Sequence, residues 1–183
     1  MNEAALLLAA TLNAGTVLAL AALGLLINER AGIVNLGTEG IMLVAAVAGY
    51  AAAVHSGSDL LAFATGAAAG ALLAAVFGVL VIWLNTNQYA TGLALSLFGV
   101  GFSAFVGQPY TRERLGERTQ FDVPLLADIP VIGGIFEQQP IAVAAVVLVI
   151  ITHFVLFYTR WGLRTRSVGE HPRAADTVGI NVV

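Results

Sequence analysis

The chain contains neither cysteine nor lysine. Without cysteine it can form no disulfide framework and no thiolate metal site. His55, His153 and His171 lie too far apart in the sequence to suggest a shared metal ion. Without lysine the chain has no P-loop of its own, because that motif uses a lysine to bind the β- and γ-phosphates of ATP. We therefore expect no metal, no cofactor and no ATPase site of that type.

Charge of either sign is also scarce. Charged residues make up 10% of the 183 residues, and 58% are apolar, whereas soluble domains contain about 25% charged residues. The mean hydropathy is +0.88, so the chain has more apolar surface than a core of this size can enclose. With a net charge of −3 it has no basic surface for a nucleic acid. The composition predicts a membrane protein, and no enzyme motif is present, so we expect no enzymatic activity.

Long uncharged runs predict the membrane spans. Four runs suit a hydrocarbon layer of roughly 30 Å: Ala4 to Ile27, Leu60 to Leu84, Tyr89 to Val106 and Ile141 to Tyr158. A fifth run, Ile41 to Val54, is too short to cross alone, so we expect its span to include part of the irregular stretch Gly32 to Gly40 as a broken helix. The predicted fold class is an all-α polytopic bundle of about five spans, organised as a single transmembrane domain over residues 1–183.

Two polar segments follow the middle and the end of these spans. We interpret residues 107–139 as a loop outside the cell. Arginines after Tyr158 predict that this end of the chain is cytoplasmic. On that side the stretch Arg164 to Ile180 is compatible with a short surface helix, because Pro172 can occupy a first helical position and Gly179 can end a helix.

Several residues allow both a functional and a simpler interpretation. Small residues recur at every fourth position in Ala62, Gly66, Gly70, Ala74 and Gly78. The glycines Gly66, Gly70 and Gly78 are either helix-packing sites or part of a moving interface. Glu39 is either a functional acid within the membrane or an acid that stabilises a helix N-terminus. Asn35 and Thr38 could likewise be helix caps, and His153 is either a proton relay or a packing residue.

Three stretches resemble the permease subunits of bacterial nucleoside ABC importers, and they occur in the same order as in that family. The stretches are NERAGIVNLGTEGIML from Asn28, NQYATGLAL from Asn87, and GLRTRSVGEHPRAADTVGI from Gly162. The wider group includes permeases for ribose, other simple sugars and branched-chain amino acids. Family members continue past the third stretch with further spans, so the resemblance implies that the chain corresponds to an N-terminal portion.

The resemblance implies a function and a set of partners. The first stretch would lie near the substrate path, which makes Asn35, Gly37, Thr38 and Glu39 candidate pathway residues. Residues 162–180 would form the cytoplasmic coupling helix that docks on an ABC ATPase subunit, with Arg164, Gly169, Glu170, Arg173, Ala174, Ala175 and Gly179 as its candidate residues. The other implied partners are a second permease subunit, an extracytoplasmic substrate-binding lipoprotein and membrane lipid. The chain would translocate nucleosides or simple sugars across the bacterial inner membrane.

Two other classes of function remain open from the residues alone. The chain could be half of an ion-coupled secondary transporter or channel, with Glu39 and His153 carrying protons or holding Na⁺. It could also be a membrane scaffold that relies on the stripe of small residues. Association with an ATPase would distinguish the importer from both.

Overall fold

The computed structural model describes residues 3–113 and 140–182, and this part of the chain is helical without any strand. The α-helices are α1 (Glu3–Arg30), α2 (Thr38–Ser56), α3 (Asp59–Gly78), α4 (Gln88–Gly107), α6 (Pro140–Tyr158), α7 (Arg160–Glu170) and α8 (Pro172–Thr177). A π-helical turn, η1 (Val79–Trp83), extends α3, and a 3₁₀-helix, η2 (Gln108–Arg112), follows α4. The predicted all-α fold class is confirmed. Most of the predicted outer loop, residues 114–139, lies outside the described residues.

Three helices in the described ranges are long and apolar enough to cross a membrane: Thr38–Ser56, Asp59–Trp83 and Gln88–Arg112. A fourth span is possible if Ala144–Tyr158 and Arg160–Glu170, which meet at a bend of 74°, count as one broken span. The predicted run Ala4 to Ile27 lies within helix α1, and its role as a membrane span stays a prediction. The sequence placed the broken span before Ile41, whereas the sharp bend lies at Thr159, between α6 and α7.

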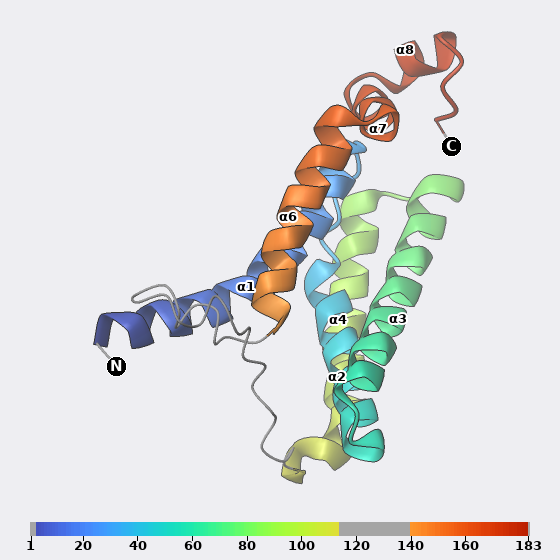
Figure 1. Cartoon of the computed structure of the whole chain (residues 1–183). Coiled ribbons are helices and arrows are strands. Elements are labelled where there is room, and N and C mark those ends of the chain that lie inside the picture. Colours follow the sequence, from blue (N-terminus) through green and yellow to red (C-terminus); the bar gives the residue numbers. More distant parts are fainter. Residues whose placement is uncertain (1–2, 114–139, 183) are drawn as a thin grey trace. The chain divides into compact units, whose positions relative to one another are not determined.

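The chain divides into two compact units, and we describe each by itself. One unit contains residues 33–116 and 181–183, with α2, α3 and α4. Within it α2 packs against both α3 and α4, while α3 and α4 barely meet (Figure 1). Val44, Leu73, Phe77 and Leu95 form its buried core, with side chains from all three helices. Helix α2 is therefore the central element of this unit.

Local chain chemistry fixes the turns of this unit. Gly57 ends α2 with φ of +64°, a left-handed conformation that favours glycine, and the Ser58 side chain caps α3. Asn85 has φ of +51° in the next turn, and Asn87 caps α4 by accepting hydrogen bonds from the Tyr89 and Ala90 amides at 3.0 and 3.1 Å. The predicted turn between the spans at residues 85–88 is thus confirmed, with Gln88 already in α4.

The other unit contains residues 1–32 and 117–180, with α1, α6, α7 and α8. At the bend between α6 and α7, the Thr159 hydroxyl accepts a hydrogen bond from the Gly162 amide at 3.2 Å and so caps α7. Gly162 lies against the Val155 and Leu156 backbone in the last turn of α6. A side chain at Gly162 would clash there, so glycine permits this tight bend.

Candidate functional site

The irregular segment between α1 and α2 is fixed to the start of α4. The Val34 amide donates a hydrogen bond to Oε1 of Gln88 at 3.1 Å. This side chain satisfies a backbone donor that has no partner within a helix, as buried backbone requires. The first and second resembling stretches, 54 residues apart along the chain at this contact, therefore meet in space.

Asn35 has a local structural role in this segment. Its side chain is buried, with 6% of its surface exposed. Its Oδ1 accepts a hydrogen bond from the Gly37 amide at 2.8 Å, and its carbonyl accepts one from the Thr38 hydroxyl at 3.2 Å. Such an Asx turn mimics a backbone turn. Asn35 and Thr38 therefore shape the entry to α2, although the residue at the N-cap position is Gly37, which makes no side-chain cap.

Four glycines allow α2 and α4 to pack with backbone against backbone. A Cβ added at Gly37 would lie 3.0 Å from the Gly92 carbonyl oxygen. One added at Gly40 would lie 2.6 Å from the Leu95 carbonyl oxygen. From the other side, an added Cβ at Gly92 would lie 2.8 Å from the Leu36 nitrogen, and one at Gly99 would collide with Gly40. Real Cβ atoms do not approach backbone this closely, so only glycine fits at Gly40 and Gly99.

Sequence reasoning singled out Gly37 as a pathway residue and Gly40 as the end of the irregular stretch, but it assigned no role to Gly92 or Gly99. The available signal was the seven-residue spacing of Gly92 and Gly99 on α4, which places both on one helix face. The structure also moves the start of α2 to Thr38, whereas we predicted that the irregular stretch extends to Gly40. Gly40 lies in the first turn of α2, and glycine is required there because α4 passes too close for any side chain.

The open side chains of this region are Leu36, which is 50% exposed, and Glu39. Glu39 lies in the first turn of α2, where its charge faces the positive end of the helix dipole. Its position fits the simpler of the two interpretations, and Thr38 is half-buried beside it. Of the four candidate pathway residues, Glu39 is the one whose side chain is exposed in this chain.

In the other unit, helix α7 crosses the ends of α6 and α1 on one glycine face. Gly162 and Gly169 are seven residues apart, so they lie on the same side of α7. Gly169 lies directly against the Arg30 carbonyl, and an added Cβ would be 2.9 Å from the Gly32 nitrogen. Gly32 itself has φ of +83°. The third resembling stretch thus packs on the first. Gly169 is covered by this contact within the chain and is not free to bind a partner protein.

The predicted coupling segment forms two helices, α7 and α8, and not one. The break falls at His171 because a residue before proline is disfavoured in helical conformation. As expected, Pro172 begins α8. Gly179, with φ of +81°, donates to the Asp176 carbonyl at 2.9 Å, and the Ile180 amide donates to the Ala175 carbonyl at 3.0 Å. This pair of bonds is a Schellman motif.

Exposure separates the candidate coupling residues into two groups. Gly169 and Ala175 are taken up by contacts within the chain, with Ala175 only 4% exposed. We expected both alanines to be open to a partner, but of the two only Ala174 is exposed. The exposed candidates are Arg164, Glu170, Arg173, Ala174 and Gly179.

The three glycines of the small-residue stripe have different surroundings. At Gly66 an added Cβ would lie 3.0 Å from the Ala45 carbonyl oxygen, and at Gly70 it would lie 3.4 Å from the Ala45 Cβ. Both glycines therefore face α2. At Gly78 an added Cβ has no atom of the described residues within 4 Å, so a packing role there stays a prediction.

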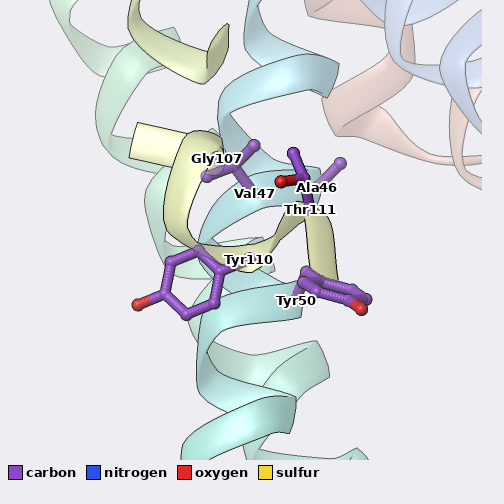
Figure 2. A pocket seen from close by; sticks show the side chains of 6 residues that line it. All are labelled: Ala46, Val47, Tyr50, Gly107, Tyr110 and Thr111. Atoms are coloured by element: carbon purple, nitrogen blue, oxygen red, sulfur yellow. The ribbon is translucent and has the colours of Figure 1, made fainter. Parts of the chain in front are cut away.

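An exposed histidine on α6 and a pocket beside α2 are two further features of the chain. The exposed His153 ring lies 4.9 Å from the Phe157 ring and 6.0 Å from the Tyr158 ring, between centroids. A pocket of about 300 Å³ lies between α2, the end of α4 and η2. It is lined by Ala46, Val47, Tyr50, Gly107, Tyr110 and Thr111 (Figure 2). The Tyr50 hydroxyl donates to the Glu113 carbonyl at 2.6 Å. Among the described residues no group of acids and histidines could hold a metal ion.

Comparison with known proteins identifies the family. Residues 7–183 match the family described as branched-chain amino acid transport system / permease component. The chain belongs to this family. The resemblance deduced from the three stretches is thereby confirmed.

Three named relatives of this chain are permeases of ABC transporters. The chain is 40% identical to a putative glucose ABC transporter permease of Haloferax volcanii over 100% of its length, and 37% identical to a guanosine ABC transporter permease of Bacillus subtilis over 94%. It is also 37% identical to a nucleoside ABC transporter permease of Lactococcus lactis over 100% of its length. It spans 57%, 58% and 61% of these relatives. No solved structure matches the chain significantly.

The family and the apolar helices agree on location. Membership in a permease family, together with three helices that could cross a bilayer, makes this chain a multi-pass protein of the inner membrane. Its named relatives are transport permeases. The predicted location is confirmed.

Proposed function

We propose that the chain is the N-terminal part of a permease subunit in a binding-protein-dependent ABC importer that carries nucleosides or simple sugars. The main support is family membership over residues 7–183 together with relatives named for guanosine, nucleosides and glucose. The chain would move solute and would leave ATP hydrolysis to a separate ABC ATPase, in keeping with its lack of lysine. A second permease subunit and an extracytoplasmic substrate-binding lipoprotein would complete the importer.

The solute path would pass the segment that enters α2. Backbone that is not helical is tolerated at membrane depth where it is buried in protein or lines a water-filled cavity. The Gln88 side chain and the glycines of α4 hold residues 33–37 in one conformation, which suits a wall that must keep its shape. The exposed Leu36 and Glu39 side chains would face the solute, while Asn35, Gly37 and Thr38 would position them.

Cysteine labelling tests this assignment, because the chain has no cysteine of its own. We expect Leu36→Cys and Glu39→Cys to react with a small polar thiol reagent in the complete transporter, and the substrate to slow both reactions at least severalfold. Ser56→Cys is the control, since Ser56 is exposed at the opposite end of α2. Its labelling should not depend on substrate. Equal labelling of all three variants with and without substrate would exclude this segment from the path.

Helix α8 is the proposed contact with the ATPase. It is short, it begins at a proline and ends in a Schellman motif, so it would move as a rigid unit. Arg173, Ala174 and the neighbouring Glu170 are exposed for contact. These residues would seat in a groove of the ATPase and transmit its movement through α7 to the ends of α6 and α1.

Charge reversal at α8 tests the coupling. Arg173→Glu should lower substrate-stimulated ATP hydrolysis about tenfold or more, since it would place a like charge or an unpaired charge in the interface. Arg173→Lys, which keeps the charge, should retain most of the stimulation. Assembly in the membrane and receptor binding should be unchanged in both variants. Full stimulation with Arg173→Glu would remove α8 as the coupling element.

A further inference from the structure

Two arginines approach one phenylalanine where α1, α6 and α7 meet. The guanidinium carbon of Arg166 lies 4.9 Å from the centre of the Phe157 ring, and that of Arg30 lies 5.9 Å from it. Both distances are in the range of cation–π contacts. Arg30 ends α1, Phe157 lies in the last turn of α6, and Arg166 lies in α7. Three elements therefore bring two positive charges to the same ring.

The backbone fixes this arrangement. Gly169 packs directly on the Arg30 carbonyl, so no side chain separates α7 from the end of α1. Arg166 precedes Gly169 by three residues and lies on a neighbouring part of the same helix face. The approach of both arginines to Phe157 thus rests on the close glycine contact and does not depend on flexible side chains alone.

The two positive charges lack a negative partner in the described part of the chain. No carboxylate of the described residues forms an ion pair with either arginine, although Glu29 and Glu170 are nearby in sequence and exposed. Nε of Arg166 is buried and has no hydrogen-bond partner among the described residues. Two positive charges at one ring, with no acid to balance them, attract an anion. An anion that binds the terminal guanidinium nitrogens would balance both charges.

The surroundings favour a lipid as the source of that anion. Phe157 and Tyr158 in the last turn of α6 are 43% and 71% exposed, and Trp161 at the start of α7 is 55% exposed. Tyrosine and tryptophan concentrate at the level of lipid headgroups. The bend of 74° turns α7 away from the direction of α6, as expected of a helix that leaves the hydrocarbon layer.

We propose that Arg30 and Arg166 bind the headgroup phosphate of an anionic phospholipid, with Phe157 holding both guanidinium groups in place. Arginine is suited to phosphate because its planar fork can donate two parallel hydrogen bonds. The terminal nitrogens of Arg166 would supply such a fork, and Arg30 would contact the phosphate from the side of α1. The acyl chains would follow the exposed apolar residues of α6, including Ile150 and Phe154.

Native mass spectrometry of the complete transporter in detergent tests this site. The preparation would be titrated with phosphatidylglycerol or with phosphatidylcholine, and the fraction of protein carrying lipid would be measured. We expect preferential retention of phosphatidylglycerol, and a loss of roughly fivefold in its affinity for each of Arg30→Gln and Arg166→Gln, as expected for removal of one interfacial arginine. Arg112→Gln, an equal change of charge at an exposed arginine of the other unit, should leave retention unchanged.

Two additional variants and one competitor make the result decisive. Arg166→Lys keeps the charge but not the fork, so it should bind phosphatidylglycerol with an affinity between those of the wild type and Arg166→Gln. Unchanged melting temperatures of the variants would show that they are folded. Equal lipid retention in the wild type, Arg30→Gln and Arg166→Gln would overturn the proposal. Displacement of the lipid by millimolar inorganic phosphate would also overturn it, because that result indicates a site for a free anion. Loss of ATPase binding in the Arg30→Gln and Arg166→Gln variants, without loss of lipid, would overturn it as well.

Discussion

Individual glycines decide where the helices of this chain can approach one another. Gly40 and Gly99 face each other across α2 and α4, and Gly169 lies on the backbone at the end of α1. Gly101, only two residues beyond Gly99, has no atom of the described residues within 4 Å of an added Cβ. The same residue type is therefore required at one position and free at another position of the same helix.

The matched pair Gly99→Ala and Gly101→Ala tests this contrast. Alanine favours a helix over glycine by about 1 kcal/mol, so Gly101→Ala should leave the melting temperature unchanged or raise it slightly. Gly99→Ala should lower it, because the added Cβ collides with the Gly40 backbone and such overpacking costs about 1–3 kcal/mol. Thermal unfolding of both variants in the same detergent measures the difference. Equal melting temperatures would contradict the close backbone contact.

At the residue scale, residues with an unusual structural role could be selected from the sequence more readily than the role itself could be predicted. Asn35 was recognised as a polar residue in an irregular stretch, yet its hydrogen bond to the Gly37 amide depends on a turn conformation that composition does not specify. The packing role of Gly40 and Gly99 could not be predicted, because a glycine in an apolar run can mark a break in the helix, a close contact or neither. Only the position of the neighbouring helix distinguishes these cases.

At the element scale, the helices follow from apolar runs, and their ends follow from turn residues. Asn87 and Pro172 begin helices as their chemistry predicts, and Gly57 and Gly179 end them. The last span was predicted to end at Tyr158, as α6 does, but the close packing of Gly162 on the last turn of α6 could not be predicted. The division of residues 164–180 at His171 was readable from the following proline, whose ring restricts the residue before it.

The end of α8 offers a test at this scale. In the complete transporter, Gly179→Ala should loosen the Schellman motif, because a non-glycine residue in the left-handed conformation costs about 1–2 kcal/mol. We expect amide hydrogen exchange at positions 179 and 180 to become roughly tenfold faster. Gly179→Asn is the control, since asparagine tolerates this conformation better, and its exchange should rise less. Unchanged exchange with alanine would mean that the motif does not stabilise the end of α8.

At the scale of the whole molecule, composition and three short stretches established the membrane location and the family, both of which the comparisons confirm. The division into two units could not be read from the sequence. It falls between Gly32 and Ile33, inside the first resembling stretch. That stretch contributes to both units, through Gly32 packed on Gly169 in one and Val34 bonded to Gln88 in the other. The solute and the partners remain proposals, because they depend on surfaces that one chain does not display.

The energy source of transport tests the proposed function most directly. The complete transporter would be reconstituted in proteoliposomes with its substrate-binding lipoprotein, and uptake of a labelled nucleoside or sugar would be measured with ATP and with a non-hydrolysable analogue. An importer of this family should take up solute only with hydrolysable ATP, and an uncoupler that collapses ion gradients should leave the rate unchanged. Uptake that proceeds without ATP and stops with the uncoupler would contradict the importer and favour an ion-coupled transporter.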